Sequence, residues 1–503
     1  MIEFSKFIYK NENVSFVYEV PKSKDFKVTL GDREVPVYNC RISKYPINTW
    51  WPGHQRPVSQ SETVSFINLV SDEDVELTVE PLTKTEYNRV MLKPYDLGVN
   101  PKVSDGRISF TLKENGGYVL ELDDYYGLLY IFNNKPCPIE DAAAVTHYFG
   151  AGVHFPGKIT LHSGDTVYVD RDAFVYGSVF ADNAENIRIY GNGIFDDSAE
   201  ERLCEHCYDA YTNGNIKLHD CRNVSVEGVG FVNSALWCVN LFHCFDVNID
   251  GINVFGQWRY NTDGVDIVNS QRVTLKNSFI HSFDDAVTIK GIDCYAFENN
   301  RDILVENCVL WCDWGKTMEI GLETECREYD NITFRHCHIL RGGNTICDIA
   351  NGDCAHVKNV TFEDISVEHE LFYSKEVLQR SEDQVYDRQD TVLVSAILRI
   401  SNPRFREQYA FLGHSDGDLS RKGESDFAAV SNVTVKDVRI YACEELVSRF
   451  GCECAKIEIN NHFPTTEYKN ISVHGVTLCG KMLSREDMNV VINGCDESVL
   501  KVN

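Results

Sequence analysis

A short pattern of alternating apolar and polar residues recurs along most of the chain. Each copy begins with Asn, Asp or Arg and then places apolar residues at every second position, as in Asn223-Val-Ser-Val-Glu227. The copies begin at Asn186, Asn223, Asp246, Arg272, Asp302, Asn331, Asn359, Asn432 and Asn470. From residue 223 to residue 359 the starting points lie 23, 26, 30, 29 and 28 residues apart. This spacing is too short for a strand–helix–strand unit and matches one coil of a β-solenoid, in which one face of each strand enters a stacked core.

The spacing of the copies widens at three places. Gaps of 37 residues (186 to 223), 73 residues (359 to 432) and 38 residues (432 to 470) predict long excursions from the coils. Residues 369–430 are polar and rich in Asp, Glu, Arg and Ser, which predicts a loop insertion. The repeat predicts one large domain over residues 139–503.

The first part of the chain lacks this period. Residues 14–20, 75–79 and 108–112 alternate in short runs separated by turn residues. This pattern is typical of an antiparallel β-sandwich. A turn-rich stretch at Asn133–Pro138 marks the boundary, so residues 1–138 are predicted to form a small sandwich domain.

Three aspartates in the solenoid are candidates for chemistry. Asp263 lies in Asn261-Thr-Asp-Gly264, and the pair Asp284–Asp285 begins 21 residues later, which is close to one coil. Residues one coil apart sit on neighbouring strands about 4.8 Å apart, so the spacing predicts one carboxylate patch. Adjacent residues point to opposite faces of a regular strand, so Asp284 and Asp285 can share a site only at a turn or bulge.

Such a patch suits acid–base cleavage of a glycosidic bond. One carboxyl group must be protonated to deliver a proton to the leaving oxygen, while another stays ionised to activate water. Crowded like charges raise the pKa of at least one member, which keeps a proton available near neutral pH. On these residues alone, a Ca²⁺ site or solvated turn aspartates explain the pattern equally well.

The motifs resemble those of glycoside hydrolase family 28, the polygalacturonases and rhamnogalacturonases. The resemblance rests on Asn261-Thr-Asp-Gly264, on the Asp284–Asp285 pair and on Asn233-Ser-Ala-Leu-Trp237, and it covers roughly residues 140–365. It implies a right-handed parallel β-helix and inversion at the anomeric carbon. It also implies that Asp284 is the general acid, while Asp263 and Asp285 hold and activate water. A sandwich ahead of such a helix further resembles glycoside hydrolase family 49, the dextranases and isopullulanases.

Two departures from family 28 concern the substrate. Lys316 stands where that family has the histidine of a Gly-His-Gly motif. The family's Arg-Ile-Lys motif, which binds the galacturonate carboxylate, aligns with Thr345–Asn351, which holds no Arg or Lys. Asp348 in this stretch would repel a carboxylate. The departures predict a neutral or non-uronic glycan, with four substrate-binding residues: Lys316, Glu319, Asp348 and Asn351.

Three alternatives stay open. The first is a polygalacturonase or rhamnogalacturonan hydrolase acting on pectic oligosaccharides. The second is a carbohydrate-binding β-solenoid without catalysis. The third is a polysaccharide lyase with Lys316 as the proton acceptor. The release of reducing sugar or of an unsaturated product separates these classes.

Further candidates for substrate binding are aromatic or lie beside aromatic residues. Trp258, Arg259 and Tyr260 precede the aspartate motif and are predicted to line the site. Trp51 and His54 belong to an aromatic and polar cluster at residues 50–56. They are candidates to reach over the cleft and stack on a sugar, with packing between the domains as the alternative.

Charge and cysteine content narrow the class of partner. The chain has 76 acidic and 48 basic side chains, a formal charge of −28, which disfavours nucleic acid and anionic membranes. The 19 cysteines fit reduced, buried residues of the coils. Cys204-Glu-His-Cys207 lacks a second ligand pair, so we expect neither a metal nor a cofactor. The first residues show no export signal, which predicts a cytoplasmic location unless a signal has been removed; a homo-oligomer is compatible with the sequence.

Overall fold

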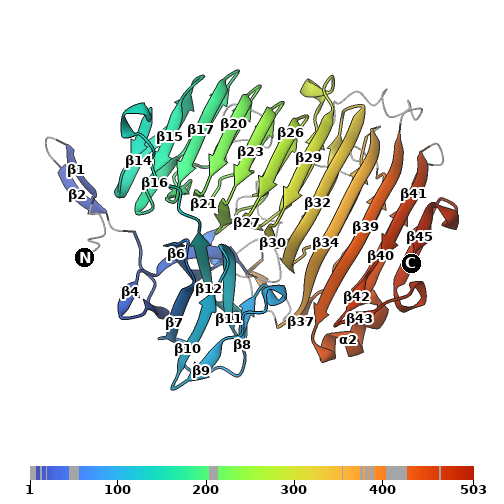
Figure 1. Cartoon of the computed structure of the whole chain (residues 1–503), viewed down its shortest axis with the longest axis horizontal. Helices are drawn as coiled ribbons and strands as arrows, with labels where there is room; N and C mark the ends of the chain where they lie inside the picture. The colour runs from blue at the N-terminus through green and yellow to red at the C-terminus, as the bar shows by residue number, and fades with distance from the viewer. Residues whose placement is uncertain are drawn as a thin grey trace.

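The computed structural model of the chain shows an N-terminal sandwich beside a long helix of parallel strands (Figure 1). The coils of the helix follow one another in chain order from one end of the molecule to the other (Figure 1). The residues that the structure describes are 7–11, 14–18, 20–44, 56–202, 213–353, 355–373, 378–379, 384–385, 390–403, 428–463 and 466–503. The predicted fold class, an all-β chain with a right-handed parallel β-helix after a β-sandwich, is confirmed.

The sandwich consists of two five-stranded sheets. In order across the first sheet its strands are β4 (Arg33–Val35), β3 (Phe26–Leu30), β7 (Val75–Pro81), β10 (Arg107–Leu112) and β9 (Lys102–Ser104). Those of the second are β5 (Tyr38–Ser43), β6 (Ser61–Val70), β12 (Asp124–Asn134), β11 (Gly116–Leu122) and β8 (Val90–Lys93). The strands pair antiparallel as predicted, with the exception of β6 and β12, which run parallel. Aliphatic side chains such as Val28, Leu77 and Leu120 fill the space between the sheets.

Each coil of the helix gives one strand to each of three parallel sheets. The repeat sheet, built from the recurring sequence pattern, contains β13 (His147–Phe149), β15 (Thr166–Val169), β17 (Glu185–Gly191), β20 (Arg222–Glu227), β23 (Phe245–Asp250), β26 (Gln271–Lys276), β29 (Asn300–Glu306), β32 (Glu328–Arg341), β34 (His356–Tyr373), β39 (Ala429–Ala442), β41 (Glu467–His474) and β45 (Leu500–Val502). The docking sheet, which faces the sandwich, contains β18 (Ile194–Asp196), β21 (Gly230–Val232), β24 (Asn253–Phe255), β27 (Phe279–Ser282), β30 (Val309–Cys312), the C-terminal parts of β32, β34 and β39, and β42 (Thr477–Leu478). The site sheet contains β19 (Ile216–His219), β22 (Val239–Phe242), β25 (Val265–Val268), β28 (Val287–Gly291), β31 (Lys316–Thr324), β33 (Thr345–Asn351), β38 (Ala396–Ser401), β40 (Lys456–Asn460) and β44 (Asn489–Asn493).

The other elements are short or join the sheets. The strands β14 (Gly152–Leu161) and β16 (Ala173–Asp182) bend from the docking sheet into the site sheet. The remaining strands are β1 (Phe7–Asn11), β2 (Val14–Tyr18), β35 (Leu378–Gln379), β36 (Gln384–Val385), β37 (Asp390–Leu393) and β43 (Lys481–Met482). The helices are α2 (Glu444–Phe450) and the 3-10 turns η2 (Val58–Gln60), η3 (Tyr95–Leu97), η4 (Ala142–Ala144), η5 (Asp293–Tyr295), η8 (Gly451–Ala455), η9 (Arg485–Asp487) and η10 (Glu497–Val499). No helix in the described parts of the chain is long and apolar enough to cross a membrane.

The first polar residue of each sequence copy lies among the first four residues of a repeat-sheet strand. All nine of these residues have positive φ, between 52° and 60°. Asn and Asp tolerate this left-handed conformation better than most residues. Their amides also stack between coils: Asn223 donates to Asn186 at 2.6 Å, and Asn470 donates to Asn432 at 3.1 Å. Each of these repeat-sheet strands therefore carries a left-handed residue near its start, and the Asn side chains link neighbouring coils.

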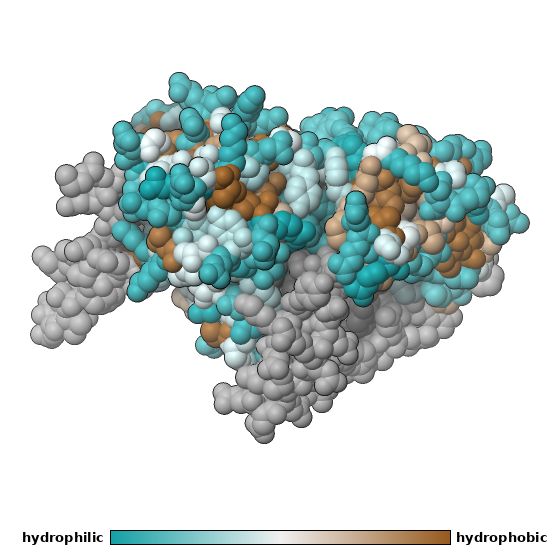
Figure 2. All heavy atoms as spheres, turned by 90° about the horizontal axis from the view of Figure 1, so that it is seen from below, coloured by the Kyte–Doolittle hydropathy of each residue, from teal (hydrophilic) through white to brown (hydrophobic). Residues whose placement is uncertain are grey.

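The interior of the helix is a continuous column of stacked aliphatic and cysteine side chains. Inward residues of neighbouring site-sheet strands lie in register, for example Val265, Val287 and Met318. Cys244, Cys308 and Cys337 are free and buried in the same column. Seen from below, the described surface is mostly polar, with hydrophobic side chains in separate patches (Figure 2).

The predicted loop insertion at residues 369–430 contains a regular part of the helix. Residues 396–401 form β38, which pairs in parallel with β33 in the site sheet. The prediction of a loop insertion is therefore wrong for this stretch. Its strand pattern, Ala-Ile-Leu-Arg-Ile-Ser, is short and lies within a polar segment, which conceals it in the sequence.

Aromatic rings join the sandwich to the docking sheet. Phe132 of β12 lies 4.5 Å from Phe255 of β24 and 5.4 Å from Phe279 of β27, measured between ring centroids. Gly117 of β11 also meets this face, where an added Cβ would lie 2.4 Å from the Phe279 ring. The sandwich and the helix thus share a closely packed interface.

A buried ion pair lies in the same interface. Both guanidinium nitrogens Nη1 and Nη2 of Arg341 donate to the carboxylate of Glu121, at 2.7 and 2.9 Å. Lys93 Nζ lies 3.7 Å from Glu121 and 2.8 Å from Glu370. Glu121 and Lys93 belong to the sandwich, whereas Arg341 and Glu370 belong to β32 and β34 of the helix. The ion pairs therefore fix the position of the sandwich relative to the helix.

Removing Arg341 is expected to destabilise the protein strongly. The variant Arg341→Ala leaves Glu121 buried without its bidentate partner, which costs about 3–5 kcal/mol. The midpoint of urea or thermal unfolding should fall clearly. Arg485→Ala is the matched control, because Arg485 pairs with Glu497 on the exposed surface and should matter little. Equal midpoints for the two variants would contradict this account of the interface.

Candidate active site

The three aspartates lie in turns that lead from the docking sheet into the site sheet. Asp263 precedes β25 and the Asp284–Asp285 pair precedes β28, and these two strands pair with each other. The backbone amide of Gly264 donates to the carbonyl oxygen of Asp285 at 2.8 Å. Neither member of the pair belongs to a strand. The turn between β27 and β28 frees both residues from the alternation of a strand and places them beside Asp263.

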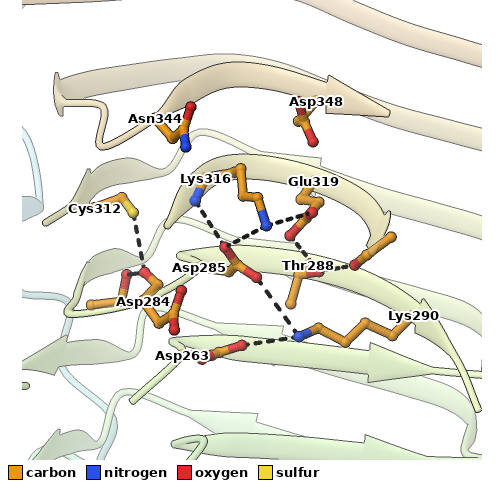
Figure 3. Close-up of polar contacts among 12 residues, drawn as sticks. Asp263, Asp284, Asp285, Thr288, Lys290, Cys312, Lys316, Glu319, Asn344 and Asp348 are labelled. Atoms are coloured by element: carbon orange, nitrogen blue, oxygen red, sulfur yellow. Dashed lines mark hydrogen bonds and ion pairs between the residues drawn. The ribbon is translucent and has the colours of Figure 1, made fainter. Parts of the chain in front are cut away.

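Asp285 lies between Lys290, which is buried, and Lys316, which is partly exposed (Figure 3). Its Oδ2 lies 3.7 Å from Lys290 Nζ, and its Oδ1 lies 3.7 Å from Lys316 Nζ. The same Oδ1 accepts a hydrogen bond of 2.8 Å from the backbone amide of Lys316. Lys290 Nζ also lies 3.1 Å from Asp263 and 3.5 Å from Asp266. Lys290 is therefore a cation shared by aspartates of two coils.

The surroundings give the adjacent carboxyl groups opposite protonation states. Burial and the charges of Asp285 and Asp263 raise the pKa of Asp284 well above its usual range. Burial also acts on Asp285, but the ammonium groups of Lys316 and Lys290 outweigh it and lower its pKa to about 2. Burial raises the pKa of Asp263 to about 7, with Lys290 opposing the rise. At neutral pH the pair therefore holds a proton on Asp284 and a negative charge on Asp285.

Both lysines stay charged in this setting. Burial disfavours the charge, but the carboxylates around Lys290 and Lys316 outweigh it and raise both pKa values well above the usual one. The groups that face Lys290 are Asp263, Asp266, Asp285, Glu323 and the ring of Trp237. Two fixed ammonium groups occupy the space among the carboxylates, which disfavours the Ca²⁺ alternative. Within the described ranges, no group of three or more His, Cys, Asp or Glu residues has the geometry to hold a metal ion.

Polar side chains continue from the aspartates along the outer face of the site sheet. Residues in register on neighbouring strands are Asp266, Thr288, Glu319, Asp348 and Arg399. Glu319 Oε1 lies 3.0 Å from Lys316 Nζ, which joins this row to the aspartates (Figure 3). The structure thus brings three of the predicted substrate-binding residues together, namely Lys316, Glu319 and Asp348.

Asp348 has a cationic partner that lies outside the Thr345–Asn351 segment. Arg399 Nε donates to Asp348 Oδ1 at 2.6 Å, and Arg399 Nη1 donates to Asn344 Oδ1 at 3.0 Å. The prediction that Asp348 repels an anionic sugar is corrected by this pair, because Arg399 neutralises the carboxylate. The side chains of Lys316 and Arg399 remain 19% and 20% exposed. Lys316 beside Asp285 and Arg399 beside Asp348 are therefore two partly exposed cations on the outer face of the site sheet.

Gly315 permits the close packing of the aspartate pair. An added Cβ at this residue would lie 2.3 Å from Asp285 Oδ1 and 2.4 Å from Asp284 Oδ1. The backbone between Trp314 and Lys316 is thus pressed against both carboxyl groups. Any larger residue must displace at least one of them.

The other predicted residues have structural contacts or lie outside the described ranges. Asn351 holds the turn after β33, because its Oδ1 accepts from Thr324 and its Nδ2 donates to the carbonyl of Ala355. It therefore does not face a ligand, and its predicted role is corrected. Trp51 and His54, like Cys204-Glu-His-Cys207, lie outside the described residues.

Only one of the three residues before the aspartate motif reaches the site. Trp258 is buried, and Arg259 donates to the backbone carbonyls of Glu200 and Ser198 at 2.7 and 3.1 Å. Both therefore pack and brace the chain instead of lining the site as predicted. The ring of Tyr260 approaches the ring of Trp314, 5.9 Å away between centroids.

Sequence reasoning missed Lys290, Arg399 and the exposed ring of Trp314. Lys290 lies 27 residues after Asp263, close to one coil, and that spacing is a usable signal. Arg399 gave no such signal, because its strand lies within the polar segment described above. Trp314 was visible only as a neighbour of Lys316.

Part of the helix is similar in sequence to one known family. Residues 142–374 match the model of Glycosyl hydrolases family 28. A stretch of 264 residues is 27% identical to the probable endopolygalacturonase D of Aspergillus niger, covering 46% of this chain and 48% of the relative. Another of 270 residues is 24% identical to the probable exopolygalacturonase B of Aspergillus fumigatus, covering 48% and 57%. The chain spans about half the length of the curated relatives that it matches.

The solved structure of Dex49A from Penicillium minioluteum shares the fold over both domains. It covers 96% of this chain and 95% of its own, with a TM-score of 0.64 and 12% identity. At this identity the likeness concerns the fold alone. The predicted resemblance to family 28, and the predicted arrangement of sandwich and helix, are both confirmed.

Gly315→Ala is expected to remove most of the activity while leaving the fold intact. The added methyl group must push the Asp284 and Asp285 carboxyl groups apart, and a misplacement of about 1 Å can cost about 100-fold in rate. The measurement is kcat, with circular dichroism as the check on folding. Gly150→Ala is the control, because its Cβ would meet only the ring of Tyr148, an exposed side chain that can move. An active Gly315→Ala variant would rule out the close packing described here.

Lys290→Met is expected to move the acid limb of the pH profile to higher pH. Lys290 lowers the pKa of both Asp285 and Asp263, so its loss raises both, by about 1–3 units for a charge at this distance. The limb of kcat/KM that reports the base therefore shifts upward whichever of the two carboxylates is the base.

Two variants keep this test interpretable. Lys290→Arg retains the charge and should keep the acid limb close to that of the unmodified protein. Lys276→Met removes a lysine of the repeat sheet that pairs with Asp250 at the surface and should leave the profile unchanged. An unshifted limb in a folded Lys290→Met variant would show that Lys290 does not set these pKa values.

Proposed function

We propose that this chain, whose residues 142–374 are family 28-like in sequence, is an inverting glycoside hydrolase. The observation that carries the proposal is the pair Asp284–Asp285, two adjacent carboxyl groups with opposite protonation preferences in one turn. Acid–base cleavage of a glycosidic bond needs a carboxylic acid and a carboxylate at the same bond.

Asp284 is the general acid in this mechanism. Its carboxyl proton passes to the glycosidic oxygen as the bond from that oxygen to the anomeric carbon breaks. Asp285 and Asp263 hold a water molecule on the other face of the sugar, and one of them accepts its proton as the water oxygen bonds to the anomeric carbon. The configuration inverts, and transfer of a proton back to Asp284 completes the cycle. Lys290 and Lys316 stay protonated and keep Asp285 ionised.

We propose pectic oligosaccharides or polysaccharides that contain galacturonate as the substrate class. The named relatives are an endopolygalacturonase and an exopolygalacturonase. Lys316 beside Asp285 and Arg399 beside Asp348 are partly exposed cations, and such groups bind a sugar carboxylate by charge-assisted hydrogen bonds. The neutral substrate predicted from the sequence is not confirmed. It rested on the lack of a cation near Asp348, and Arg399 supplies one from the next coil.

Asp284→Asn is expected to lower kcat on oligogalacturonides by about 10²–10⁴-fold, since the leaving oxygen then lacks its proton donor. The same variant should retain most of its activity on galacturonosyl fluoride, because fluoride leaves without protonation. Asp250→Asn is the matched control and should behave as the unmodified protein, because Asp250 ends β23 in the repeat sheet, where it is partly exposed and pairs with Lys276. Equal losses on both substrates would refute the assignment of the acid.

A panel of glycans tests the reaction class and the substrate together. The panel contains oligogalacturonides, rhamnogalacturonan fragments and neutral α-glucans, with reducing-sugar release as the readout. Hydrolysis of the acidic members with an inverted first product, seen by NMR, is the expected result. Activity on the neutral members alone would overturn the substrate. An unsaturated product would indicate a lyase, and binding without turnover a non-catalytic solenoid.

A further inference from the structure

Trp314 leaves an aromatic ring open beside the aspartates. Its exposed fraction is 40%, whereas those of Trp237, Trp258 and Trp311 are 4%, 8% and 0%. These four are the tryptophans that the described ranges contain. Trp314 directly precedes Gly315, which touches the carboxyl groups. An exposed aromatic ring at this place is a candidate surface for binding a ligand.

Two other rings hold Trp314 in place. Its ring stacks on that of Phe283 at 6.0 Å and 24°, and the ring of Tyr260 lies 5.9 Å from Trp314 and 6.3 Å from Phe283. The backbone amide of Trp314 donates to the carbonyl of Phe283 at 2.8 Å. The guanidinium of Arg56 lies 4.4 Å from the centroid of Phe283 and backs the cluster. We call Tyr260, Phe283 and Trp314 the aromatic shelf.

The shelf adjoins the proposed acid. Phe283 directly precedes Asp284, and Trp314 directly precedes Gly315, which touches the carboxyl groups of both Asp284 and Asp285. In the close-up, Asp284 lies on the side of Asp285 toward Cys312, away from Glu319 (Figure 3). The shelf therefore belongs to the side of Asp284, while the charged row that begins at Glu319 lies on the other side.

We propose that the aromatic shelf is a stacking subsite for the sugar ring that leaves. This inference rests on the proposed function, because the proton of Asp284 goes to the oxygen of the leaving sugar. The face of a pyranose ring that carries axial C–H bonds is apolar and packs on aromatic side chains. Trp314 offers such a surface, already fixed by Phe283 and Tyr260, so little ordering is needed on binding. The leaving sugar is thus recognised through its ring and not through its charge.

Kinetics of Trp314→Ala and Trp314→Phe test the subsite. On tetragalacturonate, Trp314→Ala should raise KM by about tenfold, more than it lowers kcat, and Trp314→Phe should give a smaller rise. Galacturonosyl fluoride has no leaving sugar, so its kcat/KM should not respond to either variant. Tyr148→Ala is the matched control, because Tyr148 is also exposed and stacked, on Tyr168 at 5.8 Å, but lies in the first coil.

A binding titration separates this inference from catalysis. Tetragalacturonate should change the tryptophan fluorescence of Asp284→Asn, and the change should disappear in Asp284→Asn/Trp314→Phe. If hydrolysis occurs and Trp314→Ala leaves KM unchanged, the shelf is not a subsite and the proposed function stands. If no hydrolysis occurs but binding of tetragalacturonate depends on Trp314, the aromatic shelf is a sugar-binding site and the proposed hydrolase activity is wrong. If the Trp314 variants lose kcat/KM equally on the fluoride and on the tetrasaccharide, the shelf does not bind the leaving sugar. If neither binding nor hydrolysis of tetragalacturonate occurs, both the subsite and the proposed function are wrong.

Discussion

The Asp285 carboxylate lies between the ammonium groups of Lys290 and Lys316, and the chemistry of the whole cluster depends on these two contacts. Removing a carboxylate from water costs several kcal/mol unless opposite charge is fixed beside it. With both lysines in place Asp285 stays ionised, whereas its neighbour Asp284 has no comparable partner and keeps its proton. Without the lysines, the buried carboxyl groups would all tend to the neutral form, and the site would hold acids but no base.

The stacking of coils is what holds these groups together. Lys316 opens β31, Lys290 lies near the end of β28, and Asp263 precedes β25, so each comes from a different coil. Backbone hydrogen bonds from Gly264 to Asp285 and from Ala286 to Lys316 fix the three turns at the spacing of neighbouring strands. Gly315 then lets the third turn press against the aspartate pair. On the docking sheet, buried rings and the Arg341–Glu121 pair fasten the sandwich to the same coils.

Much of this arrangement was predictable from the sequence, because a solenoid converts spacing along the chain into position in space. The recurring Asn and Asp residues revealed the coils, and the distance from Asp263 to Asp284 placed both in one patch. The same rule would have found Lys290. The rule failed for Arg399, because no sequence copy begins in the gap of 73 residues that contains it. It also failed for Asn351, because hydrogen bonds to a local turn leave no periodic pattern in the sequence. The exposure of Trp314 depends on which neighbours pack around it, which a sequence pattern does not specify.

The central claim is that Asp284 is protonated and Asp285 ionised at neutral pH. Infrared difference spectroscopy of the unmodified protein against Asp284→Asn and Asp285→Asn measures this without any substrate. Asp284→Asn should remove intensity from the C=O stretch of a protonated carboxyl group, and Asp285→Asn should remove intensity from the stretches of an ionised carboxylate. The reverse assignment, or a protonated band lost in both variants, would contradict the account.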